Sequence, residues 1–494
     1  MYNDQTWFFN RAKMAPTHLA CIDIDSGQQW TYAQFALLIE EWTDRLTHEK
    51  LKPGDRVAIL ATNHPELLAI LFACGLRGYI YVPLNFRLSQ SELMQIVVNC
   101  EPAILITDDT YRVLAHSLGV KRVVNREVQV AIETCVNEPE HPTPISADET
   151  CMVIYTGGTT GKPKGVQLSY NNVNWNAVNT IVSWGLTDKD CTVNYMPLFH
   201  TGGLNALTIP VLMAGGTVVI GHRFQADQAL KEIQKRKATI SLFVPTMYQK
   251  MIQTETFKNG DFPDVRFFLS GGAPCPIPIY EQFEKKGLPF KEGYGLSEAG
   301  PNNFVIDESV ARRKKGSVGK NMQFVDMLIV SEDLQPCTVN EIGELWIRGR
   351  HVFTGYWRYD KETAATMHNE WLRTGDLAKM DAEGDYYIVG RKKDIIVTGG
   401  ENVYPQEIEH CLIQHSMINE AAVIGLHDDQ WGEVVTAFVC PADPHTYSEE
   451  QLVEHCRQLL GGYKIPKKFV VLQELPKTHV GKIDKKQLAN VKLM

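Results

Sequence analysis

Several features that would place this chain in other classes of protein are missing from its sequence. None of its 11 cysteines forms a C-x-x-C pair, so neither a zinc site nor a thioredoxin-like redox centre is predicted. Cysteines scattered singly are typical of buried or free thiols in a reducing cytosol. The formal net charge of −9 lacks the basic excess of a nucleic-acid-binding protein, and no nucleic acid is expected as a partner.

Long apolar runs are missing as well. The most apolar stretch, Leu67 to Leu84, is interrupted by Arg77 and Gly78. It falls short of the roughly 20 apolar residues that a membrane-spanning helix needs. The first residues lack the charged-then-apolar pattern of a signal peptide, so we expect a cytoplasmic protein without a transmembrane segment.

One basic run stands out against the acidic background. Transient contact with anionic lipid is compatible with such a run, although four basic residues are more often a solvated loop. The sequence therefore gives no support to membrane contact, and it carries no sign of the oligomeric state. The run consists of Arg312, Arg313, Lys314 and Lys315.

The first two-thirds of the chain alternates amphipathic helical stretches with short β-branched runs. One helix is predicted at 65–76, with Asn63 as a possible N-cap, and it leads into a strand at 79–84. This alternation predicts a layered α/β architecture with parallel strand pairing. Further strands are expected at 103–108, 151–156, 215–220, 240–245 and 266–272.

The pattern changes after about residue 310. Alternating segments at 343–349 and 384–390 predict an antiparallel β region. A compact α/β pattern follows, with a helix expected at 406–414 and strands at 420–425 and 434–439. With 494 residues, the chain exceeds one compact core. We expect a body at 1–391 and a small mobile α+β lid at 392–494, divided within Arg391–Asp394.

A loop rich in glycine, threonine and lysine follows the strand expected at 151–156. Glycine lets backbone N–H groups turn toward an anion, threonine hydroxyls add neutral donors, and lysines add positive charge. The loop departs from a Walker A motif, because Pro163 follows Lys162 where serine or threonine is required. The predicted triphosphate cradle consists of Thr156, Gly157, Gly158, Thr159, Thr160, Gly161, Lys162 and Lys164.

This loop resembles the signature loop of the adenylate-forming superfamily, which comprises acyl-CoA synthetases, luciferases and the adenylation domains of peptide synthetases. One position departs from the family pattern, because Gly157 stands where the family usually has serine. Further segments resemble the superfamily in order along almost the whole chain. They are most similar to bacterial fatty-acyl-CoA synthetases.

Two of these segments concern the acid and the adenine. NYMPLFHTGGLNAL at 194–207 resembles the family segment beside the acyl pocket, in which His200 takes the place of a gate near the reacting carboxylate. The resemblance places the substrate pocket at Asn205, Thr246 and Met247. LSGGAPCP at 269–276 resembles the adenine-side loop, which implies that Gly271, Gly272 and Ala273 lie against the base.

EGYGLSEAG at 292–300 is similar to the family segment that holds the α-phosphate and the metal ion. The resemblance implies that Tyr294 and Gly295 lie beside adenine, Ser297 donates to the α-phosphate, and Glu298 holds Mg²⁺. A hydroxyl followed by glutamate is also a frequent helix start, so a capping role for Ser297 is compatible with this position.

The remaining matches lie in the last quarter of the chain. Asp376 and Arg391 take the positions that hold the ribose hydroxyls, since a carboxylate can accept two O–H bonds from a diol. Lys393 takes the hinge position of the lid, and LPKTHVGKIDKKQL at 475–488 places Lys482 as the catalytic lysine. GGENVYP at 399–405 implies a passage for the pantetheine arm along Gly399 and Gly400, although a turn that needs glycine would explain both residues as well.

The resemblance implies an acid–CoA ligase that uses ATP, Mg²⁺ and coenzyme A. The carboxylic acid first becomes an acyl-adenylate and is then passed to the CoA thiol, with AMP and pyrophosphate released. A medium- or long-chain fatty acid is the expected substrate, and an aryl acid such as o-succinylbenzoate is the main alternative.

Other classes of protein remain open at this point. An adenylation enzyme that loads a carrier is disfavoured, because no acidic residue lies within 199–210 to pair with an amino acid's ammonium group. A luciferase-like oxygenase shares the motifs without specific support. A nucleotide-binding regulator that has lost catalysis predicts erosion at Glu298 or Lys482, and both residues are present.

Overall fold

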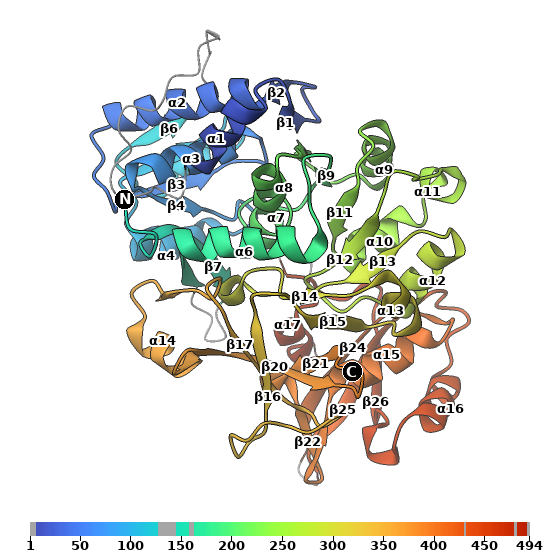
Figure 1. Ribbon diagram of the computed structural model, residues 1–494. Helices are drawn as coiled ribbons and strands as arrows, with labels where there is room; N and C mark the ends of the chain where they lie inside the picture. Colours follow the sequence, from blue (N-terminus) through green and yellow to red (C-terminus); the bar gives the residue numbers. More distant parts are fainter. Residues whose placement is uncertain (1–5, 127–144, 158–162, 429–430, 479–481, 492–494) are drawn as a thin grey trace.

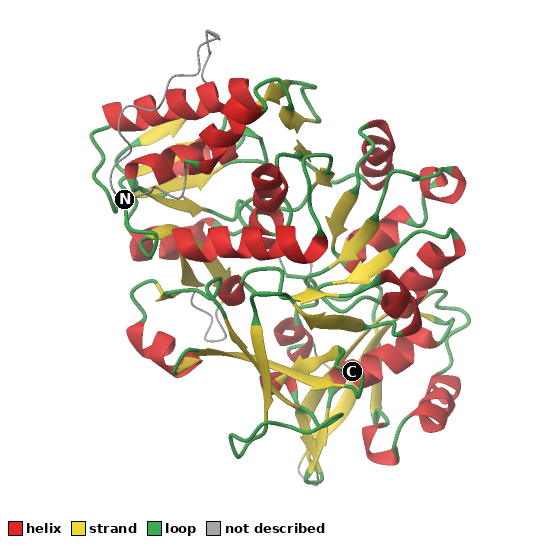
Figure 2. Cartoon of the chain, viewed as in Figure 1, coloured by secondary structure: helices red, strands yellow, loops and turns green. Residues whose placement is uncertain are grey.

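The structure is a computed structural model that describes residues 6–126, 145–157, 163–428, 431–478 and 482–491. Figure 1 shows two α/β units side by side, a β-rich region below them, and the C-terminal part packed beside that region. Figure 2 shows helices flanking the strands of the two α/β units, both on the outside and between the units. The expected α/β body with a small C-terminal α+β domain is therefore confirmed.

The first α/β unit is built on a sheet with the strand order β18-β8-β7-β4-β3-β5-β6. The strands are β3 (Arg56–Leu60), β4 (Ile80–Pro83), β5 (Ile104–Thr107), β6 (Val123–Asn125), β7 (Thr150–Gly157), β8 (Pro163–Ser169) and β18 (Gly355–Tyr356). The helices of this part of the chain are α1 (Trp7–Met14), α2 (Tyr32–His48), α3 (Glu66–Arg77), α4 (Gln90–Cys100) and α5 (Arg112–Ser117).

Two local expectations for this unit need correction. The strand at β7 pairs in parallel with β4 but forms an antiparallel hairpin with β8, so the pairing is mixed. Asn63 does not cap α3, whose N-cap is Pro65. The Asn63 side chain instead donates to Met196 O (2.9 Å) and accepts from Leu198 N (2.9 Å). It therefore joins the start of α3 to the segment expected beside the acyl pocket, a long-range bond that local sequence cannot reveal.

The second α/β unit is built on a sheet with the order β13-β12-β11-β9-β10-β1-β2, parallel except for the β1–β2 pair. Its strands are β1 (Leu19–Asp23), β2 (Gln29–Thr31), β9 (Cys191–Asn194), β10 (Thr217–Ile220), β11 (Ile240–Phe243), β12 (Phe267–Ser270) and β13 (Phe290–Glu292). The helices are α6 (Tyr170–Trp184), α7 (Thr201–Asn205), α8 (Thr208–Ala214), α9 (Ala226–Lys235), α10 (Pro245–Met251), α11 (Glu255–Asn259) and α12 (Ile277–Lys285).

The β-rich region is antiparallel, as expected from the alternation of its sequence. Its strands are β14 (Phe304–Val305), β15 (Ser317–Asn321), β16 (Asp326–Val330), β17 (Gly343–Arg348), β19 (Met367–His368), β20 (Trp371–Met380) and β21 (Tyr386–Arg391). It also contains the short helix η1 (Ser297–Ala299), α13 (Glu308–Arg313) and α14 (Asp360–Thr366).

The basic run at 312–315 is exposed at Arg312 and Arg313 and half-buried at Lys314 and Lys315. It covers the end of α13 and the residues that follow, and each of its four side chains forms an ion pair. Lys314 lies 2.6 Å from both Asp381 and Asp385, which bind it to the turn between β20 and β21. The run therefore joins elements of the fold through ion pairs with carboxylates.

The C-terminal part forms a mixed sheet of β23-β22-β25-β24 with β26 at its edge. A hydrophobic cluster of its own, which includes Ile396, Ile408, Leu412, Val423 and Leu452, lies between the sheet and its helices. No helix in the described part of the chain is long and apolar enough to cross a membrane. The elements are η2 (Lys392–Asp394), β22 (Ile396–Thr398), β23 (Glu401–Val403), α15 (Pro405–Gln414), β24 (Ile418–Asp428), β25 (Gly432–Pro441), α16 (Glu449–Leu459), η3 (Gly462–Lys464), β26 (Lys468–Val471) and α17 (Lys485–Ala489).

Candidate active site

The predicted ribose residues meet at the end of the β-rich region. Asp376 and Arg391 face one another in the register of β20 and β21, and their side chains are 3.3 Å apart. The Tyr294 hydroxyl donates to the other oxygen of Asp376 at 2.6 Å. Burial raises the pKa of Asp376, while the Arg391 charge opposes that rise. The structure therefore brings together three residues that lie far apart in the sequence.

Glu298 lies on the same side of the site. Its carboxylate accepts a hydrogen bond from the Tyr356 hydroxyl at 2.8 Å, and burial raises its pKa. Glu298 forms no ion pair within the described residues, and the nearby Arg391 charge opposes the rise of its pKa only in part. A divalent cation would pair directly with this carboxylate, and carboxylate oxygen is the ligand type that Mg²⁺ prefers. The donor chemistry at Glu298 thus fits a magnesium ion.

The described end of the glycine-rich loop lies near Tyr356, the residue whose hydroxyl donates to Glu298. Lys164 lies in β8 with its amine 5.2 Å from the centre of the Tyr356 ring, and Thr156 pairs with Lys164 across the hairpin. Gly157 is the last residue of β7, opposite Pro163. The remaining loop predictions, Gly158, Thr159, Thr160, Gly161 and Lys162, lie outside the described residues.

Lys482 approaches the site from the C-terminal domain. The residue as a whole is exposed, yet desolvation and the nearby Arg391 charge lower the pKa of its amine. The carboxylates of Asp376 and Glu298 act in the opposite direction. Burial, and then the Lys482 charge, lower the pKa of His200 to about 4, so the amine is near enough to act on the imidazole. His200 is therefore neutral near pH 7.

Ser297 does not cap a helix. The short η1 segment has Leu296 as its N-cap, and no side-chain capping bond forms there. Ser297 is buried, beside the half-buried Glu298. Gly295 lies so close to the chain that a Cβ atom there would be 2.2 Å from Pro301 O. Only glycine fits this approach, which fixes the path of the segment into the site.

The loop expected on the adenine side follows β12. Gly272 has a φ of +83°, a conformation that favours glycine, whereas a Cβ at Gly271 would make only ordinary contact with Leu242. Ala273 is half-buried beside them. Glu292 at the end of β13 accepts hydrogen bonds from Cys275 N (3.1 Å) and the Tyr280 hydroxyl, and burial raises its pKa to about 7. Glu292 thereby ties this loop to the neighbouring strand.

Gly399 and Gly400 form the turn between β22 and β23. Their φ values of +59° and +85° are those of a tight hairpin turn that favours glycine at both positions. Both residues are exposed, and so is Lys393 in the preceding η2 segment. A tight turn therefore accounts for both glycines. In this arrangement the C-terminal domain presents Lys482, not the glycine turn, to the side of the site where its charge acts on His200.

The predicted pocket residues are only partly brought together. Asn205 is buried, and its amide donates to Thr201 Oγ1 at 3.1 Å within α7. Thr246 and Met247 are half-buried at the start of α10. Met247 packs against the cluster around Phe243. Asn205 therefore lies in the helix that follows His200, whereas Met247 packs against the hydrophobic core.

Two residues of the site were missed by sequence reasoning. Tyr356 holds Glu298 but lies in the short β18 strand, far from every quoted motif. Glu292 is the first residue of the EGYGLSEAG motif. The sequence signal for its role was a carboxylate directly before a glycine. Neither role follows from spacing, because both depend on which strands become neighbours.

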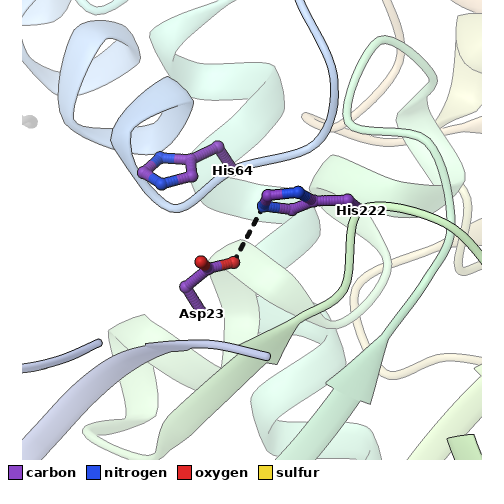
Figure 3. Close-up of side chains that lie close together, drawn as sticks. All are labelled: Asp23, His64 and His222. Carbon is purple, nitrogen blue, oxygen red and sulfur yellow. Dashed lines mark ion pairs between the residues drawn. The ribbon is translucent and has the colours of Figure 1, made fainter. Parts of the chain in front are cut away.

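A second cluster of titratable side chains lies at the ends of β1 and β10 (Figure 3). His222 Nε2 is 2.9 Å from Asp23 Oδ1, and the ligand atoms of Asp23, His64 and His222 lie within 4.8 Å of one another. His64 Nδ1 accepts from Glu66 N at 3.1 Å, so neutral His64 carries its proton on Nε2. The nearby Arg126 charge lowers the pKa of His64, after burial. These features favour an ion pair over a metal site.

The main site therefore offers a Mg²⁺-binding carboxylate at Glu298, cations at Lys164, Arg391 and Lys482, and an ion-paired carboxylate at Asp376. This combination suits a polyanionic ligand that arrives with a divalent cation. Residues of both the body and the C-terminal domain contribute to this site.

Comparison with known proteins agrees with this geometry. Residues 8–357 match the family model of AMP-binding enzymes, and residues 407–482 match that of the AMP-binding enzyme C-terminal domain. A feruloyl-CoA synthase from Amycolatopsis sp is 35% identical over 97% of this chain and 96% of its own length. An indoleacetate–CoA ligase from Aromatoleum aromaticum is 34% identical over 92% of each chain. The o-succinylbenzoate CoA synthetase of Bacillus subtilis, solved with its acyl-adenylate intermediate, superimposes with a TM-score of 0.88 at 32% identity, covering 99% of this chain and 98% of that one.

Proposed function

Because the chain belongs to the AMP-binding enzyme family and is an AMP-forming acid–CoA ligase, we propose that its substrate is an aromatic carboxylic acid. The enzyme uses ATP, Mg²⁺ and coenzyme A. The three relatives compared above carry the names of ferulate, indoleacetate and o-succinylbenzoate, all of them aromatic acids. This agreement supports an aryl acid over the fatty acid that the sequence favoured.

The first step joins two anions, the carboxylate and the α-phosphate of ATP. The carboxylate is already a nucleophile, so the residues must position charges rather than remove a proton. We assign Glu298 to hold the Mg²⁺ ion, which neutralises phosphate charge when bound. Ser297 and Lys482 donate to the reacting phosphate, and the loop that ends at Lys164 holds the leaving part of the triphosphate.

The remaining assignments concern binding. Asp376 and Arg391 hold the ribose, with the Tyr294 hydroxyl fixing the Asp376 carboxylate at 2.6 Å. Gly271, Gly272, Ala273 and Gly295 leave room for the base. His200 borders the acyl group as a neutral ring, which avoids placing a second cation beside Lys482.

In the second step the CoA thiol attacks the acyl-adenylate carbonyl and AMP leaves. We assign residues 392–494 to a lid that turns about Lys393, withdraws Lys482 and brings the Gly399–Gly400 turn to the site. The described arrangement, with Lys482 beside His200 and the glycine turn exposed, corresponds to the first step.

The convergence of Lys482, Glu298, Asp376 and Arg391 supports the assigned adenylation chemistry, and the names of the relatives carry the choice of an aromatic acid. The test is AMP release by the purified protein with Mg-ATP, with and without CoA. The panel contains ferulate, indoleacetate, o-succinylbenzoate, benzoate, butyrate and palmitate. CoA-dependent turnover of the aromatic acids supports the proposal, whereas turnover confined to butyrate or palmitate overturns it.

A further inference from the structure

A short segment of the chain, Phe353 to Trp357, lies between the two parts of the site assigned to the metal ion and to the triphosphate. At its start, Phe353 N donates to Glu298 O at 2.8 Å. At its end, Trp357 N donates to Gly165 O at 2.7 Å, within the β7–β8 hairpin that carries Lys164. Between these bonds, β18 pairs antiparallel with β8. The backbone of this segment therefore joins η1 to the β7–β8 hairpin.

The side chain of Tyr356 makes the same connection. Its hydroxyl donates to Glu298 Oε1 at 2.8 Å, and the Lys164 amine lies 5.2 Å from the centre of its ring. The Phe353 ring packs against it edge-on, with the ring centres 5.0 Å apart, and Tyr356 is 9% exposed. One buried side chain thus contacts both the carboxylate assigned to Mg²⁺ and the lysine at the end of the glycine-rich loop.

The backbone around Glu298 does little to fix its side chain. Glu298 lies in a helix of three residues whose N-cap forms no side-chain hydrogen bond. A glutamate has several rotamers, and a metal ion that needs one of them must overcome that freedom. The Tyr356 hydroxyl selects one orientation of the carboxylate before a ligand binds. A carboxylate has about four lone-pair sites, so the bond leaves sites open to a cation.

The Tyr356 ring acts on Lys164 in a different way. A cation over an aromatic ring is attracted by its π-electron face without giving up its N–H donors to a carboxylate. Lys164 is half-buried and forms no ion pair within the described part of the chain. The ring therefore limits where the amine lies, while the N–H donors stay available to a phosphate group.

We propose that Tyr356 is a positioning residue that fixes the Glu298 carboxylate for Mg²⁺ through its hydroxyl and the Lys164 amine for the triphosphate through its ring. One side chain then keeps the carboxylate and the amine at a fixed separation. This inference rests on the roles assigned to Glu298 and Lys164 in the proposed function. A tyrosine with only a packing role predicts a different result, in which its loss weakens the binding of every nucleotide alike.

Tyr356→Phe tests the hydroxyl, because it keeps the ring. The readout is the ratio of the calorimetric dissociation constants of α,β-methylene ATP in EDTA and in Mg²⁺. By linkage, this Mg²⁺ gain measures how strongly the enzyme–nucleotide complex holds the metal ion. The gain should fall roughly tenfold in Tyr356→Phe, a factor typical of residues that orient a metal ligand. The affinity in EDTA should not change, because the contacts to the ribose, the base and Lys164 remain.

Tyr356→Leu tests the ring. The affinity for α,β-methylene ATP in EDTA should now fall by about two- to fivefold as well, since Lys164 loses a cation–π contact. Tyr32→Phe is the matched control. Its buried hydroxyl donates to Leu212 O (3.0 Å) and Gly216 O (2.8 Å) at the end of α8, and its loss should change neither the affinity in EDTA nor the Mg²⁺ gain.

A double-variant cycle separates positioning from packing. Glu298→Gln should lower the Mg²⁺ gain more than Tyr356→Phe does. Adding Tyr356→Phe to Glu298→Gln should then have no further effect, because the hydroxyl acts through the carboxylate. An unchanged gain in Glu298→Gln removes the assigned metal ligand and the inference with it.

Two other results would overturn the inference alone. One is an undiminished Mg²⁺ gain in Tyr356→Phe. The other is an equal loss of nucleotide affinity with Mg²⁺ and in EDTA, which indicates a packing role. None of these measurements needs an acid. If the Mg²⁺ gain falls as expected while no aromatic acid is turned over, the proposed substrate fails and the role of Tyr356 stands.

Discussion

Lys482 illustrates how one residue depends on two domains. It belongs to the C-terminal chain, yet the groups that change the pKa of its amine are Arg391, Asp376 and Glu298. The net effect lowers that pKa below its ordinary value of about 10.4. The amine therefore lies near other charged groups, and these groups belong to the body of the protein.

Lys482→Ala should slow acyl-adenylate formation by about 10²–10³-fold, because it removes a donor aimed at developing phosphate charge. ATP affinity should change much less, since the loop and Arg391 remain. Single-turnover formation of the acyl-adenylate measures the first quantity, and calorimetry measures the second. Lys468→Ala, an exposed lysine on β26, is the matched control. A normal adenylation rate in Lys482→Ala would remove this residue from the reaction.

The alkaline side of the pH profile offers a second test of the same residue. Because the pKa of Lys482 is lowered, adenylation should begin to fall at a pH below that at which an ordinary lysine loses its charge. Arginine stays protonated throughout this range. In an active Lys482→Arg enzyme the fall should therefore move to higher pH. An identical profile in both proteins would show that a different group titrates.

At the scale of elements, buried ion pairs connect helices to the first sheet. Glu66 in α3 accepts from Trp42 Nε1 in α2 at 3.0 Å and pairs with Arg126 at 2.8 Å. Both charged side chains are about nine-tenths buried, with exposures of 9% and 10%. Burial raises the pKa of Glu66 and the Arg126 charge opposes the rise.

Arg126→Met should lower the free energy of unfolding by about 3–5 kcal/mol, because it leaves the Glu66 carboxylate buried without a countercharge. Urea denaturation measures the loss. The double variant Arg126→Met, Glu66→Gln keeps an acceptor for Trp42 and removes the charge, so it should recover most of the stability. Equal losses in the single and double variants would mean that packing, not charge, explains the effect.

The cluster at the ends of β1 and β10 makes stability depend on pH. Hydrogen bonding to Asp23 raises the pKa of His222, so this contribution is complete below about pH 6.5 and is lost as pH rises through the raised pKa. His222→Gln should lose this dependence of stability on pH above about 6.5. Urea unfolding across this pH range tests the prediction, and a wild-type pH dependence retained in the variant would contradict it.

At the scale of the whole molecule, we propose that the two steps of the reaction use two positions of the C-terminal domain. The C-terminal sheet has its own hydrophobic cluster and is joined to β21 through the short η2 segment. A domain with its own core can turn as a unit when the connection changes its dihedral angles. The described position brings Lys482 to the site and leaves the Gly399–Gly400 turn exposed.

Lys393→Pro should block the turning of the lid, because proline fixes φ at the proposed hinge. Adenylation should stay close to the wild-type rate, while thioester formation slows strongly and acyl-adenylate accumulates. Quenched-flow measurement of both half-reactions separates the two steps. Lys393→Ala is the control and should support both steps, because alanine leaves φ free to change at this position. Thioester formation at a normal rate in Lys393→Pro would exclude this hinge.

Much of the fold was predictable from local pattern. The helix expected at 65–76 is α3, and the strands expected at 103–108 and 240–245 are β5 and β11 with slightly shorter bounds. The antiparallel region was readable from its alternating residues. The Asn63 bond to Met196 and the β7–β8 hairpin were not predictable in the same way, since each depends on partners chosen by the assembled chain.

The sequence by itself determined the family, the order of the motifs and the residue types available for nucleotide and metal binding, because these follow from short segments whose chemistry is local. Only the tertiary structure decided which of them meet. Tyr356 reaches Glu298 and Glu292 reaches Cys275 across different strands. Hydrogen bonding and burial are set by neighbours in space, and the sequence lists neighbours only along the chain.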